Sequence, residues 1–329
     1  MAASTNDSPQ VKRVPIHERS FTMGKFVGIN GYHSNHSLLK QRFAEGGYQL
    51  SETPHFLIFT RSQAPSLIVV HWFAPEEIDA NIGDYFVQEL KPPGILVDEQ
   101  DFGDLFGAIV FSLFPRDTRR ALHLYGTNTL HQYQYLLDIP DDEFTPSQST
   151  IHSFAQLYRR VCQLRVGQTF LDVGCSFGFL PLLISEHFSS LTQILGVDIQ
   201  TSPFPIISAI AAEHHLQNIN FAQADVLANS FSTLGRFDTV VALHVLEHFT
   251  EADMYQALLN LLNVTSRRLI IAVPYENEKP ERVYGHEQLF DRARLAAIGD
   301  WCLQHLKGPG YIAVEDCAGG FLLVERCAA

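Results

Sequence analysis

The chain has 329 residues, which is enough for two domains of ordinary size. Hydrophobic residues make up 46% of it and charged residues 18%, so a buried core is available and extensive disorder is excluded. The formal net charge of −13 argues against nucleic acid or an anionic lipid surface as a general partner. No apolar run reaches the ~18 residues that a membrane span needs.

Residues 1–15 are polar and contain no apolar core of a secretory signal, so we expect a flexible tail that ends near Pro15. The five cysteines are odd in number, and no two have C-x-x-C spacing. This pattern argues against a disulfide framework and against a zinc ribbon. We therefore expect reduced thiols and a cytoplasmic protein.

The N-terminal half mixes strand and helix patterns. Residues 66–73 (SLIVVHWF) predict a strand, residues 76–90 a helix introduced by Pro75, and residues 118–131 a second helix. We interpret residues 16–138 as an α+β accessory domain. Pro, Asp, Ser and Thr gather in residues 139–150, which favours turns, so a linker is expected there.

Residues 151–329 alternate short apolar runs with helical stretches, which is typical of βαβ units around a parallel, Rossmann-like sheet. The expected strands are 169–173, 193–198, 219–222, 239–243 and 269–273. The expected helices are 153–163, 179–188, 206–215, 252–262 and 292–305. Two further strands, 311–316 and 321–326, flank a Gly-Gly pair, which is a hairpin signal. The sequence therefore predicts an α/β fold with seven strands and a C-terminal antiparallel hairpin.

The most informative segment is TFLDVGCSFGFLP, residues 169–181, where Gly174 and Gly178 frame a turn between a strand and a helix. Glycines let the backbone approach a ligand closely, and the helix N-terminus offers N–H groups without partners. The spacing D-x-G-x-x-x-G lacks the denser glycines of a dinucleotide site. It suits a ligand that carries both a carboxylate and an ammonium group, such as the methionine part of S-adenosylmethionine, with Asp172 facing the ammonium.

Acidic residues also follow the next two strands. Asp198 comes about 20 residues after the last glycine, where a carboxylate can bind both ribose hydroxyls. Asp225 is placed to accept from the adenine amino group. Each aspartate alone could be a helix N-cap, but three successive strand ends favour one pocket at the carboxyl edge of the sheet. The residues expected to line it are Asp172, Gly174, Cys175, Gly178, Asp198, Ile199, Asp225, Val226, Leu243 and His244.

Residues 169–273 resemble the class I S-adenosylmethionine-dependent methyltransferases, and RFDTVVALHVLEHF looks like their fourth-strand segment. Three shorter motifs resemble the mycofactocin oligosaccharide methyltransferase family: CSFGF, VPYENEKPERVYGHEQLFD and the terminal GGFLLVER. The chain departs from that family in its longer N-terminal half and in the order Cys175-Ser176. This resemblance implies methylation of a hydroxyl on a glucose chain carried by a peptide-derived redox cofactor.

A hydroxyl acceptor needs a base, because its pKa lies far above 7. The candidates are His244, after the fourth strand, and Glu276 and His286, after the fifth; His286 is the preferred base. The alternative is that His286 only orders its loop. His248 is expected to pack against the sheet. Potential metal ligands include Glu247, but no spacing demands an ion, so no metal is predicted.

The expected partner is a small-molecule acceptor, with a carbohydrate favoured by the aromatic content, and neither nucleic acid nor a membrane. The aromatic candidates are Tyr125, Tyr133, Tyr135, Tyr275 and Tyr284. The accessory domain is expected on the acceptor side of the reaction. Two alternatives stay open: a methyltransferase-like binding subunit without catalysis, and a protein methyltransferase. Base methylation is disfavoured, because ALHVLE stands where NPPY or DPPY would follow the fourth strand.

Overall fold

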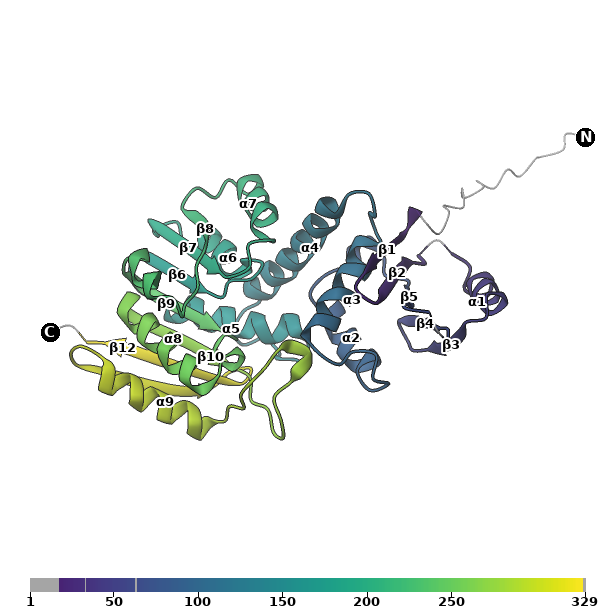
Figure 1. Ribbon diagram of the computed structural model, residues 1–329. Helices are drawn as coiled ribbons and strands as arrows, with labels where there is room; N and C mark the ends of the chain where they lie inside the picture. Colours follow the sequence, from purple (N-terminus) through teal and green to yellow (C-terminus); the bar gives the residue numbers. More distant parts are fainter. Residues whose placement is uncertain (1–17, 33, 63, 328–329) are drawn as a thin grey trace, which may run out of the picture. The chain divides into compact units, whose positions relative to one another are not determined.

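The computed structural model describes residues 18–32, 34–62 and 64–327, and the tail expected over 1–15 lies outside these ranges (Figure 1). The chain divides into two compact units. The first holds the described residues up to Glu77 together with Gly103–Ala121, and the second holds Ile78–Phe102 and everything described after Leu122. The segments 78–102 and 122–138, placed in the accessory domain by the sequence analysis, thus belong to the second unit. No helix in the described ranges is long and apolar enough to cross a membrane.

The first unit is built on a five-stranded sheet with the order β1-β2-β5-β4-β3. Its strands are β1 (Ser20–Met23), β2 (Phe26–Asn30), β3 (Gln49–Glu52), β4 (Phe56–Thr60) and β5 (Leu67–His71). Strands β2 and β5 are parallel, and the other neighbours are antiparallel. An apolar cluster that includes Leu39 of α1 (His36–Glu45) and Phe59 of β4 forms its core. The buried His71 closes one end through a 2.8 Å hydrogen bond from Nε2 to Ser112 Oγ.

The helix expected over 76–90 forms in two pieces. A 3-10 turn, η2, spans Pro75–Glu77, and α2 begins only at Ile82 and ends at Leu90. The interruption has a local cause, because the Asp79 carboxylate accepts from the Asn81 N–H at 2.8 Å and thereby favours a turn over a helix. Helix α3 (Glu99–Phe111) was not expected, and α4 (Thr118–Asp138) continues beyond the expected 118–131.

The second unit is built on a seven-stranded sheet with the order β11-β12-β10-β9-β6-β7-β8, which confirms the predicted seven-stranded α/β architecture. Its strands are β6 (Thr169–Val173), β7 (Gln193–Asp198), β8 (Ile219–Gln223), β9 (Phe237–Leu243), β10 (Thr265–Val273), β11 (Gly310–Asp316) and β12 (Gly320–Arg326). Strands β6 to β10 are parallel to one another, whereas β12 is antiparallel to both β10 and β11. The carboxyl ends of five strands therefore lie at one edge.

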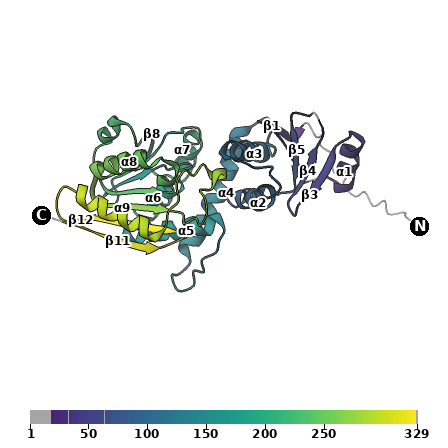
Figure 2. The ribbon, with the colours of Figure 1, turned by 60° about the horizontal axis from the view of Figure 1, so that its bottom comes forward.

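Helices cover both faces of this sheet. They are α5 (Thr150–Leu164), α6 (Phe179–His187), α7 (Phe204–Glu213), α8 (Glu251–Val264) and α9 (Arg292–His305), with 3-10 turns η3 (Asn229–Leu234), η4 (Leu246–His248) and η5 (Arg282–Tyr284). Figures 1 and 2 show α8 and α9 on one side, where Leu258 and Leu295 share a buried cluster with Leu171 of β6. Side chains alternate along a strand, so Phe170 and Asp172 point to the other face.

We expect the buried hydroxyl of Thr239, in the central strand β9, to stabilise the entry to β6. Thr239 Oγ1 accepts from the Val166 N–H at 2.9 Å and donates to the Val166 carbonyl at 2.8 Å. Thr239→Val keeps the shape and leaves both backbone groups without this partner, so the free energy of unfolding of the second unit should fall by about 1–2 kcal/mol.

Urea unfolding measures this change. The chain has two tryptophans, and Trp72→Phe leaves Trp301 of α9 as a fluorescent reporter of the second unit. The control is Thr192→Val, because Thr192 is exposed and its hydroxyl makes a 3.3 Å bond at the surface. Equal unfolding midpoints for the two variants would contradict the role given to Thr239.

Candidate functional site

The turn after β6 can be made only by glycine at two positions. Gly174 has φ +73° and Gly178 has φ +70°, the left-handed region that costs other residues energy. A Cβ atom would lie 2.6 Å from Val245 Cγ2 at Gly174 and 2.5 Å from Phe221 Cε1 at Gly178. Gly178 also caps the N-terminus of α6. The turn is therefore packed directly against the segment that follows β9. Its shape is also fixed by its own backbone, because the N–H groups of Gly174 and Cys175 donate to the Val197 carbonyl and that of Gly178 donates to the Cys175 carbonyl.

Asp198, at the end of β7, closes this turn. Its Oδ2 accepts from the Ser176 N–H at 2.9 Å, and its Oδ1 accepts from the Gln200 N–H at 2.9 Å. The next residue, Ile199, leaves 62% of its apolar side chain exposed, which is unusual for an isoleucine. The Asp198 carboxylate and the apolar side chain of Ile199 thus follow β7 directly, next to the glycine turn.

The third expected carboxylate, Asp225, is exposed and follows β8. Its Oδ1 accepts from the Leu227 N–H at 2.8 Å, so part of its function is to hold a local turn. The remaining predicted lining residues Cys175, Val226 and Leu243 are buried. Burial raises the pKa of the Cys175 thiol, which disfavours the reactive thiolate, so we interpret this residue as part of the pocket lining and not as a nucleophile.

Asp172 is the most unusual carboxyl group of the site. It is 5% exposed, and burial together with the neighbouring Asp198 carboxylate raises its pKa well above the usual range. Burial raises the pKa of the Tyr158 phenol, in α5, and the nearby Asp172 charge raises it further. None of the ion pairs among the described residues involves Asp172 or Asp198. Two neighbouring carboxylates without a cationic partner favour a positively charged ligand.

A second polar group follows β9. His244 has φ +53°, uncommon for a residue other than glycine, and its N–H donates to the Ala272 carbonyl at 2.9 Å. Its Nδ1 lies 3.3 Å from Glu247 Oε1, and its ring centroid is 5.0 Å from that of Phe154. Glu247 is fully buried, and neither of its carboxylate oxygens has a hydrogen-bond partner among the described residues.

The loop after β10 brings two predicted catalytic residues together. His286 is 5% exposed, and its Nδ1 lies 2.7 Å from Glu276 Oε1. The other carboxylate oxygen of Glu276 accepts from the Glu281 N–H at 3.1 Å, which fixes the orientation of the carboxylate. The imidazole of His286 is therefore held by a carboxylate that is itself held by the backbone.

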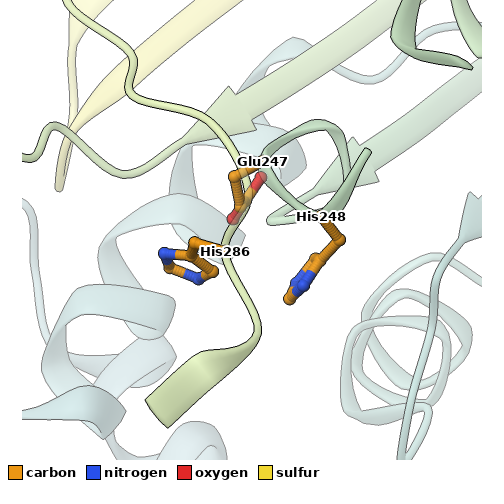
Figure 3. A group of neighbouring side chains, drawn as sticks. All are labelled: Glu247, His248 and His286. Atoms are coloured by element: carbon orange, nitrogen blue, oxygen red, sulfur yellow. The ribbon is translucent and has the colours of Figure 1, made fainter. Parts of the chain in front are cut away.

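The segments after β9 and β10 are tied to each other. The Glu247 carbonyl accepts from the Glu287 N–H at 2.8 Å, and the Nδ1 atom of His248 lies 3.3 Å from the Gly285 carbonyl oxygen. The ring centroids of His248 and His286 are 5.2 Å apart. Figure 3 shows the side chains of Glu247, His248 and His286 gathered from these two segments.

His248 differs from the expectation that it packs against the sheet. It is exposed and lies in the short turn η4, where it bonds across to the loop after β10. Two of the aromatic candidates, Tyr125 and Tyr133, are buried at 8% and 2% exposure and belong to the core. Sequence reasoning also missed Tyr158 as a neighbour of Asp172, because no spacing links a helix residue to a strand that begins after it.

A comparison with protein families concerns the same part of the chain. Residues 170–267, less than a third of the chain, match the protein family described as "Methyltransferase domain". Among curated proteins, (S)-coclaurine N-methyltransferase of Papaver somniferum is 29% identical over 122 residues, which are 37% of this chain and 33% of that protein. N-methyltransferase 4 of the same plant is 27% identical over 28% of this chain and 26% of its own length. The matches thus span between about a quarter and a third of these relatives.

Two solved structures are also similar to parts of this chain. Magnesium protoporphyrin IX methyltransferase of Synechocystis, with bound S-adenosylmethionine, has 18% sequence identity and a TM-score of 0.39, and the alignment covers 78% of this chain and 98% of that one. The methyltransferase domain of a bacterial Hen1 protein has 17% identity and a TM-score of 0.43, with 53% of this chain and 99% of that one covered.

We expect Asp172→Asn to stabilise the unligated protein. The pKa of Asp172 is raised in the fold above its unfolded value of about 4, so ionisation costs folding free energy as pH rises from about 4 through the folded pKa. Asparagine removes this cost. At neutral pH the thermal midpoint of the second unit should rise by about 2–4 °C, the shift that corresponds to ~1 kcal/mol in a unit of this size.

The measurement follows Trp301 fluorescence on heating, in the Trp72→Phe background, from about pH 4 to about pH 8. The gain from Asp172→Asn should be smallest near pH 4 and should grow with pH. Asp300→Asn, on the exposed side of α9, is the matched control and should give no pH-dependent gain. A midpoint lowered at neutral pH would show that the Asp172 charge is already compensated.

Proposed function

We propose that this chain is a class I methyltransferase that takes its methyl group from S-adenosylmethionine. The observation that carries the proposal is the glycine turn after β6, with the two carboxylates Asp172 and Asp198 beside it and no cationic partner for either among the described residues. The match of residues 170–267 to a methyltransferase domain supports it independently.

The charge of the site fits this cofactor. S-adenosylmethionine carries an ammonium and a sulfonium, and a positive group bound next to Asp172 would offset the burial and the Asp198 charge that raise the pKa of this carboxyl group. Asp172 would bind the ammonium group, and Asp198 would bind the ribose hydroxyls. A dinucleotide, by contrast, would bring its anionic pyrophosphate to the glycine turn, next to the Asp172 carboxyl group. The exposed Ile199 side chain offers the adenine ring an apolar surface next to Asp225.

The chain's own task in methyl transfer is mainly alignment. When bound, S-adenosylmethionine supplies an electrophilic methyl carbon, whose bond to sulfur breaks as the acceptor atom bonds to it. The turn at Gly174 packs against Val245, so the polar residues that follow β9 lie next to the cofactor turn. His244, Glu276 and His286 are the groups that we assign to the acceptor, whose approach they would orient.

The acceptor is proposed at two levels. The broader proposal is a small molecule, and the finer one is a hydroxyl on a sugar, as the mycofactocin oligosaccharide methyltransferase resemblance implies. An amine acceptor is the second candidate, since the curated relatives carry N-methyltransferase names. Assignment of the N-terminal residues 16–138 to the acceptor and a cytoplasmic location remain predictions. All five cysteines are unpaired, which is compatible with a reducing compartment.

Asp198→Ala tests the cofactor assignment. The change removes charge-assisted hydrogen bonds to the ribose, which should cost about 1.5–3 kcal/mol, or roughly 10- to 150-fold in affinity for S-adenosylmethionine. Isothermal titration calorimetry with the cofactor and with S-adenosylhomocysteine measures it. Asp300→Ala serves as the control. A folded Asp198→Ala protein with unchanged affinity would remove Asp198 from the site.

Transfer of a labelled methyl group distinguishes the acceptor classes. The full chain is incubated with labelled S-adenosylmethionine and either glucose oligosaccharides or the amine (S)-coclaurine, which the name of one relative gives. Label on the sugar supports the finer proposal, and label on the amine supports the second candidate. Cofactor binding without transfer to any small molecule or to protein would instead favour a binding subunit that has lost catalysis.

A further inference from the structure

We infer that Glu247, His248 and His286 form a binding site for a divalent transition-metal ion (Figure 3). Each residue offers one ligand atom, and these atoms all lie within 4.8 Å of one another. Glu247 and His248 come from η4, after β9, and His286 comes from the loop after β10. Three donors from two strand ends therefore meet at the carboxyl edge of the sheet.

The strongest argument is the state of the Glu247 carboxylate. The residue is fully buried, and both of its oxygens are without a hydrogen-bond partner among the described residues. A carboxylate in that position is costly unless a cation or hydrogen-bond donors compensate it. His244 Nδ1 lies 3.3 Å from Oε1, within ion-pair distance, but it forms no hydrogen bond with either oxygen, so the carboxylate keeps free lone pairs that an ion can bind.

Both histidines are oriented in the way that metal ligands usually are. The Nδ1 atom of His286 lies 2.7 Å from Glu276 Oε1, and the Nδ1 atom of His248 lies 3.3 Å from the Gly285 carbonyl oxygen. An imidazole that donates from Nδ1 to an oxygen keeps the lone pair on Nε2, which is then the coordinating atom. Glu276 would thus act as a positioning residue for His286. The same arrangement recurs in many metal sites, where such outer carboxylates tune affinity.

The donor set indicates the kind of ion. One carboxylate and two imidazoles suit Mn²⁺, Co²⁺, Fe²⁺ or Zn²⁺, whereas Ca²⁺ and Mg²⁺ favour sets made of oxygen alone. Three protein ligands leave coordination positions for other molecules. His248 is exposed, so an ion and a further ligand can reach the site from solvent.

This inference rests on the proposed function for the role of the ion, but not for its binding. A divalent ion beside the cofactor turn would hold an acceptor hydroxyl and lower its pKa, so that its proton is lost to solvent and the oxygen can take the methyl group. His286 Nε2 cannot bind an ion and accept a proton at the same time. The site therefore replaces the base role that the sequence predicted for His286 with the role of a ligand.

The test is metal binding by the full chain after treatment with a chelator. Calorimetric titrations with MnCl₂, CoCl₂ and ZnCl₂ should each give one ion per chain, and bound Co²⁺ should show visible absorption bands of a mixed nitrogen and oxygen site. Glu247→Gln, His248→Asn and His286→Asn should each weaken binding at least 100-fold, since each removes one of three ligands. Glu276→Gln should weaken it by about 10- to 100-fold, as expected for a positioning residue.

A matched control is available in another histidine–glutamate pair of the same unit. His214 Nδ1 lies 2.6 Å from Glu186 Oε1, far from η4 in sequence, and His214→Asn should leave ion affinity unchanged. Cofactor affinity, measured in the same variants with the chelator present, reports whether they fold. His248 lies at the surface, so we expect His248→Asn to disturb folding less than the other two ligand variants.

The outcomes separate this inference from the proposed function. Absence of stoichiometric binding, or binding that persists in both Glu247→Gln and His248→Asn, would overturn the metal site and leave the methyltransferase proposal intact. Binding of one ion that these variants lose would support it, even in a protein that fails to bind S-adenosylmethionine. In that second case the proposed function fails and the metal site stands.

Discussion

Parallel strands finish at the same edge of a sheet, and this constraint determines where the polar residues of the second unit meet. Strands β6 to β10 all run in one direction, so the chain must reverse through a loop or turn after each of them. The glycine turn follows β6, Asp198 ends β7, and His244 follows β9. These residues are far apart in sequence, but they lie close together because the strands that carry them end at the same edge. The hydrophobic core only has to keep the strands in register.

The sequence predicts this unit well because its signals are local. The limits of β6 and β7 agree with the expected 169–173 and 193–198, since each strand is an apolar run bounded by residues that favour turns. The pattern fails where a single side chain decides the backbone, as Asp79 does before α2. It also fails in the N-terminal half, where the buried face of each element depends on partners far away in sequence.

The site divides in the same way. Three carboxylates at strand ends follow from strand limits alone, so their positions could be predicted. The contact of Glu276 with His286 could not, because these residues are ten positions apart in a loop, which has no periodicity that fixes which side chains meet. Whether the Glu247 oxygens have hydrogen-bond partners depends on all the side chains packed around them, so the spacing of residues in LHVLEHF cannot predict it. Asp172 and Glu247 share one feature: each is a buried carboxyl group that a cationic ligand would compensate.

The left-handed backbone at His244 has a consequence for how this position can vary. Side chains branched at Cβ are penalised at positive φ, whereas Gly, Asn, Asp and His adopt it at lower cost. Homologues that no longer need an imidazole here should therefore drift toward asparagine or glycine rather than toward valine or isoleucine. The positive φ thus limits which residues this position accepts, and the need for an imidazole limits them further. A conserved histidine among distant homologues would be informative, because the backbone alone leaves at least three other residues acceptable.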